Sequence, residues 1–187
     1  MTSSCLACPY RSCGLTLVEL IIALAVLTLL IAIGVPSLTT LSIRNEQTTS
    51  LNGFLSHFYL ARSLAIQKEQ HVVICPSSDG ERCKEEPIWS TGLIIFEDSK
   101  RDGVLASDEP IVAKYLLPER TKLLIHSSEH RKRVVYHGDG RPSGYNLTLT
   151  FCDPKERIEP KALIVNNVGR IRISERGPED SPLKCDH

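Results

Sequence analysis

Residues Leu17 to Val35 form a long apolar stretch that is interrupted only by Glu19, Thr28 and Gly34. As a helix with a rise of about 1.5 Å per residue, this stretch is about 28 Å long, close to the hydrocarbon thickness of a bilayer. A secretory signal peptide would have a shorter apolar core and a small-residue cleavage site, which the residues after Val35 do not provide. The pattern therefore predicts a helix that crosses a membrane.

A second periodic pattern follows, in which apolar side chains recur every three or four residues and so share one stripe of a helix. The stripe consists of Leu51, Phe54, Leu55, Phe58 and Ala65, with Arg62 as its polar exception. His57 lies beside the stripe and is interpreted as a surface or boundary residue. Pro36 favours a break or kink, but helical patterning resumes after it. We therefore predict one long helix from about Leu17 to Gln67, its first half in lipid and its second half packed on a domain.

From His71 the pattern changes to short runs rich in β-branched and aromatic residues. Turn-forming clusters separate these runs at residues 75–80, 98–103 and 138–144. The predicted strands are 71–75, 89–98, 111–116, 121–126, 133–137, 145–152, 161–167 and 169–174. A long helix followed by about eight strands indicates an α+β fold in which the helix covers one face of antiparallel sheets.

The cysteines divide into two groups. Cys5, Cys8 and Cys13 precede Gly14, and four cysteines follow it. An even number in a small domain, without metal-ligand spacing, favours two disulfides and an oxidising compartment. Three pairings are open, of which we favour Cys75 with Cys83 and Cys152 with Cys185; the second would pin the Pro-rich tail to a strand. The leader thiols are interpreted as unpaired, because no second pair completes a zinc site.

Charge adds a smaller constraint. Lys+Arg and Asp+Glu both number 22, so the balance argues neither for nor against a nucleic-acid partner. Residues 119–187 hold 13 basic and 10 acidic side chains, which makes the C-terminal third mildly basic. Arg11, the one charge of the leader, orients the N-terminus toward the cytoplasm.

Glu19 is the unusual residue of the apolar stretch. A carboxylate inside a membrane helix costs about 2.5 to 3.5 kcal/mol, so it is a functional candidate by default. The sequence has no Lys or Arg between Arg11 and Arg44, so its partner must come from another molecule. If cleavage follows Gly14, the new amine at Leu15 of a neighbouring subunit could meet Glu19 in a filament. The alternative is an ordinary membrane anchor with an incidental glutamate.

The run Gly14-Leu-Thr-Leu-Val-Glu19, followed by the apolar stretch, resembles the processing motif of type IV prepilins and type II secretion pseudopilins. The resemblance implies cleavage after Gly14 by an inner-membrane prepilin peptidase, N-methylation of Leu15, and a role for Glu19 in subunit registry. Two departures are Leu15, where the family usually has Phe, and the weakly charged leader.

The resemblance extends over the β-region. The pieces that carry it are WSTG at 89–92, FEDSKRDG at 96–103, Cys152 and the closing GRIRI at 169–173. In this order they resemble the GspH/FimT family of pseudopilins and minor pilins. The family implies a type IV pilin-like fold and a single-pass protein of the bacterial inner membrane, later assembled with other pilin or pseudopilin subunits into a pilus or pseudopilus. The implied parts are a leader (1–14), a transmembrane segment (15–36), its amphipathic continuation (37–67) and a periplasmic β-rich domain (68–187).

The closing strand carries candidate chemistry. Because side chains alternate along a strand, Ile171 and Ile173 are predicted to point inward and Arg170 and Arg172 outward, roughly 6 to 7 Å apart. Two forked donors on one face could engage successive phosphates, and Gly169 allows a sharp turn before them. The alternative is an ordinary solvated edge strand.

In the FimT branch of the family, a GRxR motif at this position implies DNA binding during natural transformation, and Gly169, Arg170 and Arg172 match it. Scarce aromatic residues favour sequence-independent phosphate contacts over base stacking. Further cations that could contribute are Arg131, Lys132, Arg133, Lys161 and Arg176.

The sequence gives little support for a calcium site or for catalysis. Asp98, Asp102, Asp108 and Glu109 gather around Gly103, but the alternate-oxygen spacing of a calcium loop is absent, which favours a surface turn. No nucleophile motif is present, so we expect neither an enzyme nor a metal or other cofactor.

The favoured hypothesis is a FimT-like minor pilin that binds DNA. The alternatives are a GspH-like pseudopilin of type II secretion or a purely structural minor pilin, and, more remotely, a membrane-anchored enzyme or binding domain outside any filament.

Overall fold

The computed structural model describes residues 16–128, 130–144 and 146–185. Helix α1 spans Leu17–Lys68, which confirms the predicted helix. Thr16 Oγ1 accepts a hydrogen bond of 3.2 Å from the backbone N–H of Glu19, satisfying one of the donors at the helix start. Among the described residues, α1 is the one helix long and apolar enough to cross a membrane, and no side chain of that apolar window is buried.

The chain separates into two compact units between Thr39 and Thr40. Every buried apolar residue of the described chain, beginning with Ile43, belongs to the second unit, Thr40–His187, called here the β-rich unit. A fragment that begins near residue 40 therefore contains the whole hydrophobic core.

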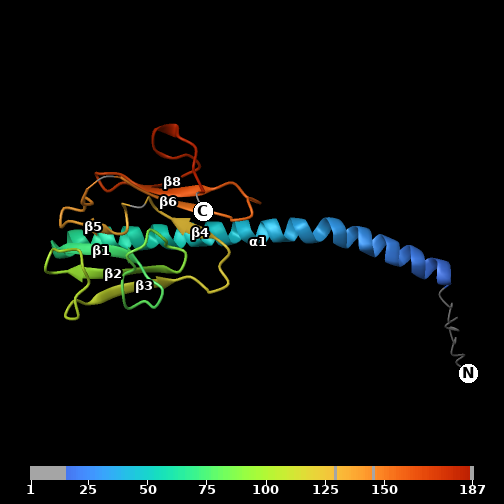
Figure 1. Cartoon of the computed structure of the whole chain (residues 1–187), viewed down its shortest axis with the longest axis horizontal. Helices are drawn as coiled ribbons and strands as arrows, with labels where there is room; N and C mark the ends of the chain where they lie inside the picture. Colours follow the sequence, from blue (N-terminus) through green and yellow to red (C-terminus); the bar gives the residue numbers. More distant parts are fainter. Residues whose placement is uncertain (1–15, 129, 145, 186–187) are drawn as a thin grey trace, which may run out of the picture. The chain divides into compact units, whose positions relative to one another are not determined.

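The eight predicted strands are all present, and they form two four-stranded antiparallel sheets (Figure 1). The first sheet has the order β3-β2-β1-β5 and the second the order β4-β6-β7-β8. Their bounds are β1 His71–Pro76, β2 Gly92–Asp98, β3 Ile111–Leu116, β4 Leu124–His126, β5 Val134–Tyr136, β6 Leu147–Cys152, β7 Lys161–Val165 and β8 Ile171–Ser174. Strand β8 is at the end of the second sheet, so among the described strands β7 is its one neighbour.

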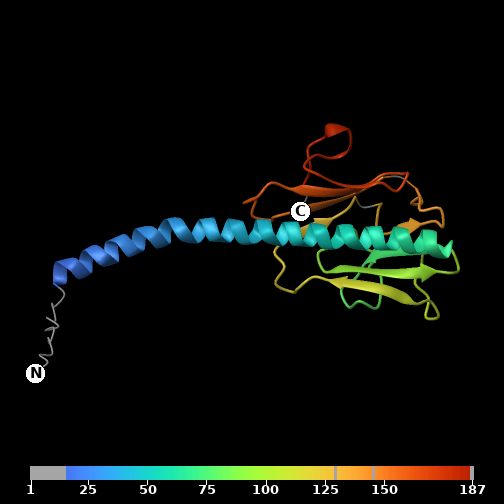
Figure 2. The same cartoon turned by 180° about the vertical axis from the view of Figure 1, so that it is seen from behind.

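The C-terminal half of α1 packs against both sheets, as the two opposite views show (Figures 1 and 2). The predicted stripe is its buried face, and Phe54 lies at its centre. The Phe54 ring centroid is 5.3 Å from that of Phe151, 5.8 Å from Tyr115 and 6.4 Å from Trp89. Aromatic residues of both sheets therefore meet on one helix residue, which ties the two sheets into a single core.

Both favoured disulfides are present, Cys75–Cys83 and Cys152–Cys185. The first holds a loop over a small apolar cluster on the outer face of the first sheet, where Cys75 packs with Val73 and Phe96. The second joins the end of β6 to the C-terminal tail. The two bonds therefore fasten the β1–β2 loop and the C-terminal tail to the sheets.

The acidic segment after β2 is a surface turn, as predicted, since residues 99–102 are exposed, but two of its carboxylates are buried. Asp98 accepts hydrogen bonds from the backbone N–H groups of Asp102 and Gly103. Glu109 does the same for the N–H groups of Ser99, Lys100 and Ala106. The carboxylates thus satisfy the backbone of the turn, which is what allows their burial.

Candidate functional site

The turn between β7 and β8 places the arginine strand, and Asn166 organises it. Its side-chain oxygen accepts hydrogen bonds from the backbone N–H groups of Val168 (3.2 Å) and Arg170 (2.8 Å). The backbone N–H of Gly169 donates to the Asn166 carbonyl, and the Asn166 N–H donates to the Arg170 carbonyl. These four bonds fix the backbone of Arg170 at the point where β8 begins.

Gly169 is required by this turn for two separate reasons. Its φ of +79° lies in the left-handed region, which side chains disfavour. In addition, a Cβ at this position would lie 2.4 Å from the carbonyl oxygen of Gly140, a backbone atom of a different turn. The glycine of the predicted motif therefore serves the close packing of two turns.

Arg62 of α1 binds both of these turns. Its Nε donates to the Gly140 carbonyl at 3.0 Å, and its Nη2 lies 3.5 Å from the Val168 carbonyl. The side chain is half-buried, and the charged donor satisfies two backbone acceptors that are 78 and 106 residues away in sequence. In the sequence, Arg62 is the one polar residue of an apolar helix stripe. That exception is the signal that could have indicated its contact with the two turns.

The two arginines of the motif are both exposed. The guanidinium of Arg170 has no hydrogen bond or ion pair with any residue that the structure describes. That of Arg172 donates to the Ser174 hydroxyl at 3.2 Å, and no carboxylate within the described ranges pairs with it. Within the part of the chain that the structure describes, no carboxylate therefore compensates the positive charge at the start of β8.

The inward-facing residues of β8 match the prediction in part. Ile171 is 5% exposed and belongs to the core, whereas Ile173 is 40% exposed.

Three of the five additional cations form ion pairs with carboxylates. Lys161 pairs with Glu175 at 3.3 Å, and Arg176 pairs with Asp180 at 3.5 Å. Arg131 lies against Gly144, where its Nη1 is 2.9 Å from the position of a Cβ, and Lys132 is half-buried. Their contribution to DNA contact stays a prediction.

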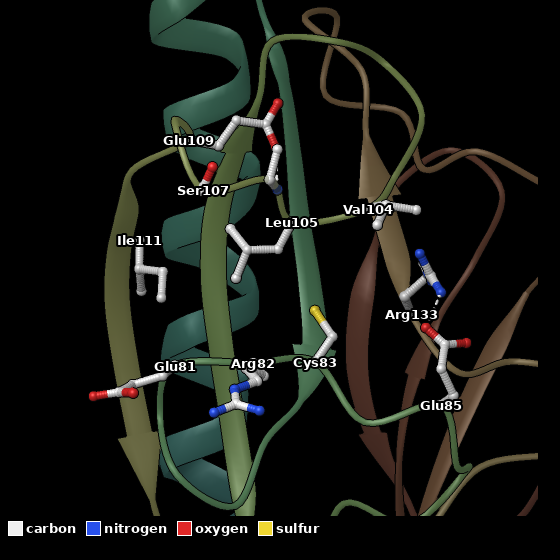
Figure 3. A pocket seen from close by; sticks show the side chains of 11 residues that line it. Glu81, Arg82, Cys83, Glu85, Val104, Leu105, Ser107, Glu109, Ile111 and Arg133 are labelled. Carbon is white, nitrogen blue, oxygen red and sulfur yellow. Dashed lines mark hydrogen bonds and ion pairs between the residues drawn. The ribbon is translucent and has the colours of Figure 1, made fainter.

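Arg133 is engaged in a different part of the β-rich unit. Its guanidinium donates to the Gly103 carbonyl and forms an ion pair with Glu85. Figure 3 shows this pair at the side of a pocket of about 470 Å³, into which Cys83 and Leu105 point. Arg133 therefore balances an acidic residue above the outer face of the first sheet.

The predicted processing site, Gly14 and Leu15, lies outside the described residues. Glu19 is in the first turn of α1, and its side chain is exposed. None of the ion pairs among the described residues involves it. The observed contact of Glu19 is the helix cap formed by Thr16.

Comparison with known proteins agrees with this architecture. The sequence profile described as type II transport protein GspH matches residues 50–169, and that of the prokaryotic N-terminal methylation motif matches residues 10–35. No curated protein sequence matches the chain.

Solved structures add the fold. The type IV minor pilin FimU of Pseudomonas aeruginosa superposes with a TM-score of 0.56 at 20% identity, over 73% of this chain and 96% of that one. A second crystal form of FimU gives a TM-score of 0.52 at 19% identity, over 73% and 98% of the two chains. The minor pseudopilin EpsH of the type 2 secretion system of Vibrio cholerae gives 0.49 at 16% identity, over 69% and 96%. The likeness to FimU shows a shared type IV pilin-like fold.

Proposed function

The chain belongs to the GspH family, and from this premise we propose that it is a minor pilin that binds DNA through strand β8 during DNA uptake. It is a minor pilin or pseudopilin of the type IV pilus or type II secretion kind. Within that class, the proposed role is assembly through the N-terminal helix and capture of DNA by the β-rich unit in natural transformation. The chain acts in this proposal by binding and not by catalysis.

The observation that carries the proposal is the uncompensated charge of Arg170 and Arg172 on a rigidly placed edge strand. Other exposed arginines of this protein pair with a carboxylate, as Arg141 and Arg176 do. At the start of β8 the backbone is held by Asn166, while the guanidinium groups extend from alternate positions of the strand. Two forked donors held in this way can bind neighbouring phosphates bidentately.

The surrounding charges set the strength of this interaction. Because Lys161 and Arg176 are ion-paired, we count only Arg170 and Arg172 as phosphate contacts of this site. Binding by one domain is therefore expected to be weak, independent of sequence and strongly dependent on salt.

Changing Arg170 and Arg172 together to Gln is expected to lower the affinity of the β-rich unit for duplex DNA at least tenfold. Each phosphate contact releases counterions, so the slope of log affinity against log salt should also fall by about 2. The measurement is fluorescence anisotropy with a labelled duplex at several salt concentrations, using residues 40–187.

The matched control is Arg82→Gln with Arg120→Gln, which removes the same charge from exposed loops next to the first sheet. The control should retain most of the affinity. Equal affinity of the β8 variant and the parent, or an equal loss in the control, would overturn the assignment of the site.

A pseudopilin role is the second candidate, and the description of the matching family profile, type II transport protein, favours it. In that role β8 would be an ordinary solvated edge, and the arginine change would leave secretion unaffected. Neighbouring genes for pili or competence, as opposed to a secretion operon, separate the two roles.

Assembly is proposed to follow processing by an inner-membrane prepilin peptidase after Gly14 and N-methylation of Leu15, with the β-rich unit in the periplasm. The freed amine of a neighbouring subunit would then neutralise Glu19 in the membrane. Glu19→Ala is expected to lower incorporation into filaments about tenfold, because the pairing is lost. Immunoblotting of sheared filaments, normalised to membrane-inserted protein, measures this; undiminished incorporation would contradict the pairing.

A further inference from the structure

Two histidines face each other across the first sheet, at the end opposite the disulfide loop. His71 is the first residue of β1, and His137 follows the last residue of β5. Because Val72 pairs with Tyr136 in antiparallel register, the two histidines lie at directly opposed cross-strand positions. Both are half-buried, so their rings are held by the sheet and still reach solvent.

The contact between the two rings is made nitrogen to nitrogen. His137 Nδ1 lies 2.9 Å from His71 Nε2, and the ring planes are 86° apart with centroids separated by 4.5 Å. One nitrogen carries a proton and the other accepts it, so two imidazole ligand atoms are directed at the same small volume. Imidazole nitrogens at this spacing are the donor set that zinc and other borderline transition metals prefer.

The spacing fits a single ion. For a metal at about 2.05 Å from each nitrogen, two ligands at a right angle are about 2.9 Å apart, and two tetrahedral ligands about 3.3 Å. The observed separation is therefore already within the range that coordination requires. Metal binding requires the donor ring to hold its proton on its other nitrogen, so that both facing nitrogens have a lone pair. A small rotation of the two rings would then direct these lone pairs at a shared ion.

The charges around the pair are mixed. Asp98 acts on His71 and Asp139 on His137, and both carboxylates favour a cation; Arg101 near His71 opposes one. The pKa of His71 is held below its ordinary value by burial of the ring and by the nearby His137 and Arg101. Asp98 acts on this pKa in the other direction.

We propose that His71 and His137 form a binding site for one transition-metal ion of the zinc class, which clamps β1 to β5. Within the described ranges no group of three or more His, Cys, Asp or Glu side chains is placed to hold a metal. The pair therefore supplies two ligands, and water fills the remaining positions. All four cysteines of the unit are in disulfides, so thiolates do not compete for the ion.

The test uses residues 40–187 without a histidine tag, stripped of metal with a chelator. With ZnCl₂ at about a hundredfold excess over its dissociation constant, the Tm is expected to rise by roughly 5 °C or more. Excess EDTA should reverse the rise, and MgCl₂ or CaCl₂ at the same concentration should have no effect, because these ions prefer oxygen ligands.

His71→Gln and His137→Gln should each abolish the zinc-dependent rise, whereas His57→Gln, at a half-buried histidine stacked on Tyr115, should retain it. NMR of the unmodified unit provides a readout that does not depend on the folding of variants, since zinc should shift the imidazole protons of His71 and His137 selectively. Absence of a Tm rise in the parent, retention of the rise in either variant, or shifts at other histidines alone would overturn the proposal.

Discussion

Gly169→Ala is expected to lower the free energy of unfolding by about 3 kcal/mol and to reduce DNA affinity as much as the paired arginine change. An alanine at a φ of +79° is strained by about 1 to 2 kcal/mol. Its Cβ would also lie 2.4 Å from the Gly140 carbonyl oxygen and 3.0 Å from Arg62 Nε, and such overpacking costs about 1 to 3 kcal/mol. Relief of this clash must displace the turn that places Arg170.

Urea denaturation of the β-rich unit measures the stability, and fluorescence anisotropy measures the DNA affinity. Gly103→Ala is the matched control, because Gly103 has a φ of +72° but the nearest atom to its Cβ position is 3.6 Å away. The control should lose about 1 to 2 kcal/mol, from backbone strain alone. If Gly169→Ala is no more destabilising than Gly103→Ala, the contact between the two turns does not have the importance that we assign to it.

Removal of the Cys152–Cys185 disulfide, by changing both residues to Ala, is expected to lower the free energy of unfolding by about 4 kcal/mol. The bond closes a loop with a sequence separation of 33, and the entropy that it removes from the unfolded chain grows with loop length. The tail that it fastens lines a groove beside the second sheet, where Pro178 and Leu183 lie opposite Thr148 and Thr150.

The Cys75–Cys83 pair is an internal control for this prediction. Its sequence separation is 8, so the same double change is expected to cost about 2.5 kcal/mol. Equilibrium denaturation without reductant gives both values. An equal or larger loss for the shorter loop would show that chain entropy is not the dominant contribution of these bonds.

Local pattern was sufficient to predict the elements of this fold. The spacing of Leu51, Phe54 and Phe58 predicted a helix that ends near Gln67, and α1 ends at Lys68, because burial of that stripe is what stabilises the helix. All eight strands lie within a few residues of the predicted runs, because turn residues separate them. What local pattern could not give is their pairing: β4 precedes β5 in the chain but joins the second sheet, while β5 returns to β1 of the first.

For the candidate site too, the residues that are adjacent in sequence could be predicted, and the contacts between distant residues could not. Gly169, Arg170 and Arg172 form a contiguous motif, so the sequence was enough to identify them. Arg62 and Gly140 support that motif from positions remote in sequence, and His71 meets His137 across 66 residues. Such contacts depend on the register of strands and the packing of turns, which no short window of sequence contains. The buried carboxylates Asp98 and Glu109 were missed for a related reason, since their partners are backbone groups of a folded turn.

The carbonyl of Gly140 beneath Gly169 changes how the motif should be compared among relatives. The packing of the neighbouring turn requires a glycine at position 169 whether or not any ligand is present. A glycine at this position in a homologous chain therefore indicates the same fold and not DNA binding. The side chains at positions 170 and 172 are exposed, so the fold does not require arginine at either position. In a survey of homologous chains, those two positions are where a DNA-binding subset should be distinguished from purely structural subunits.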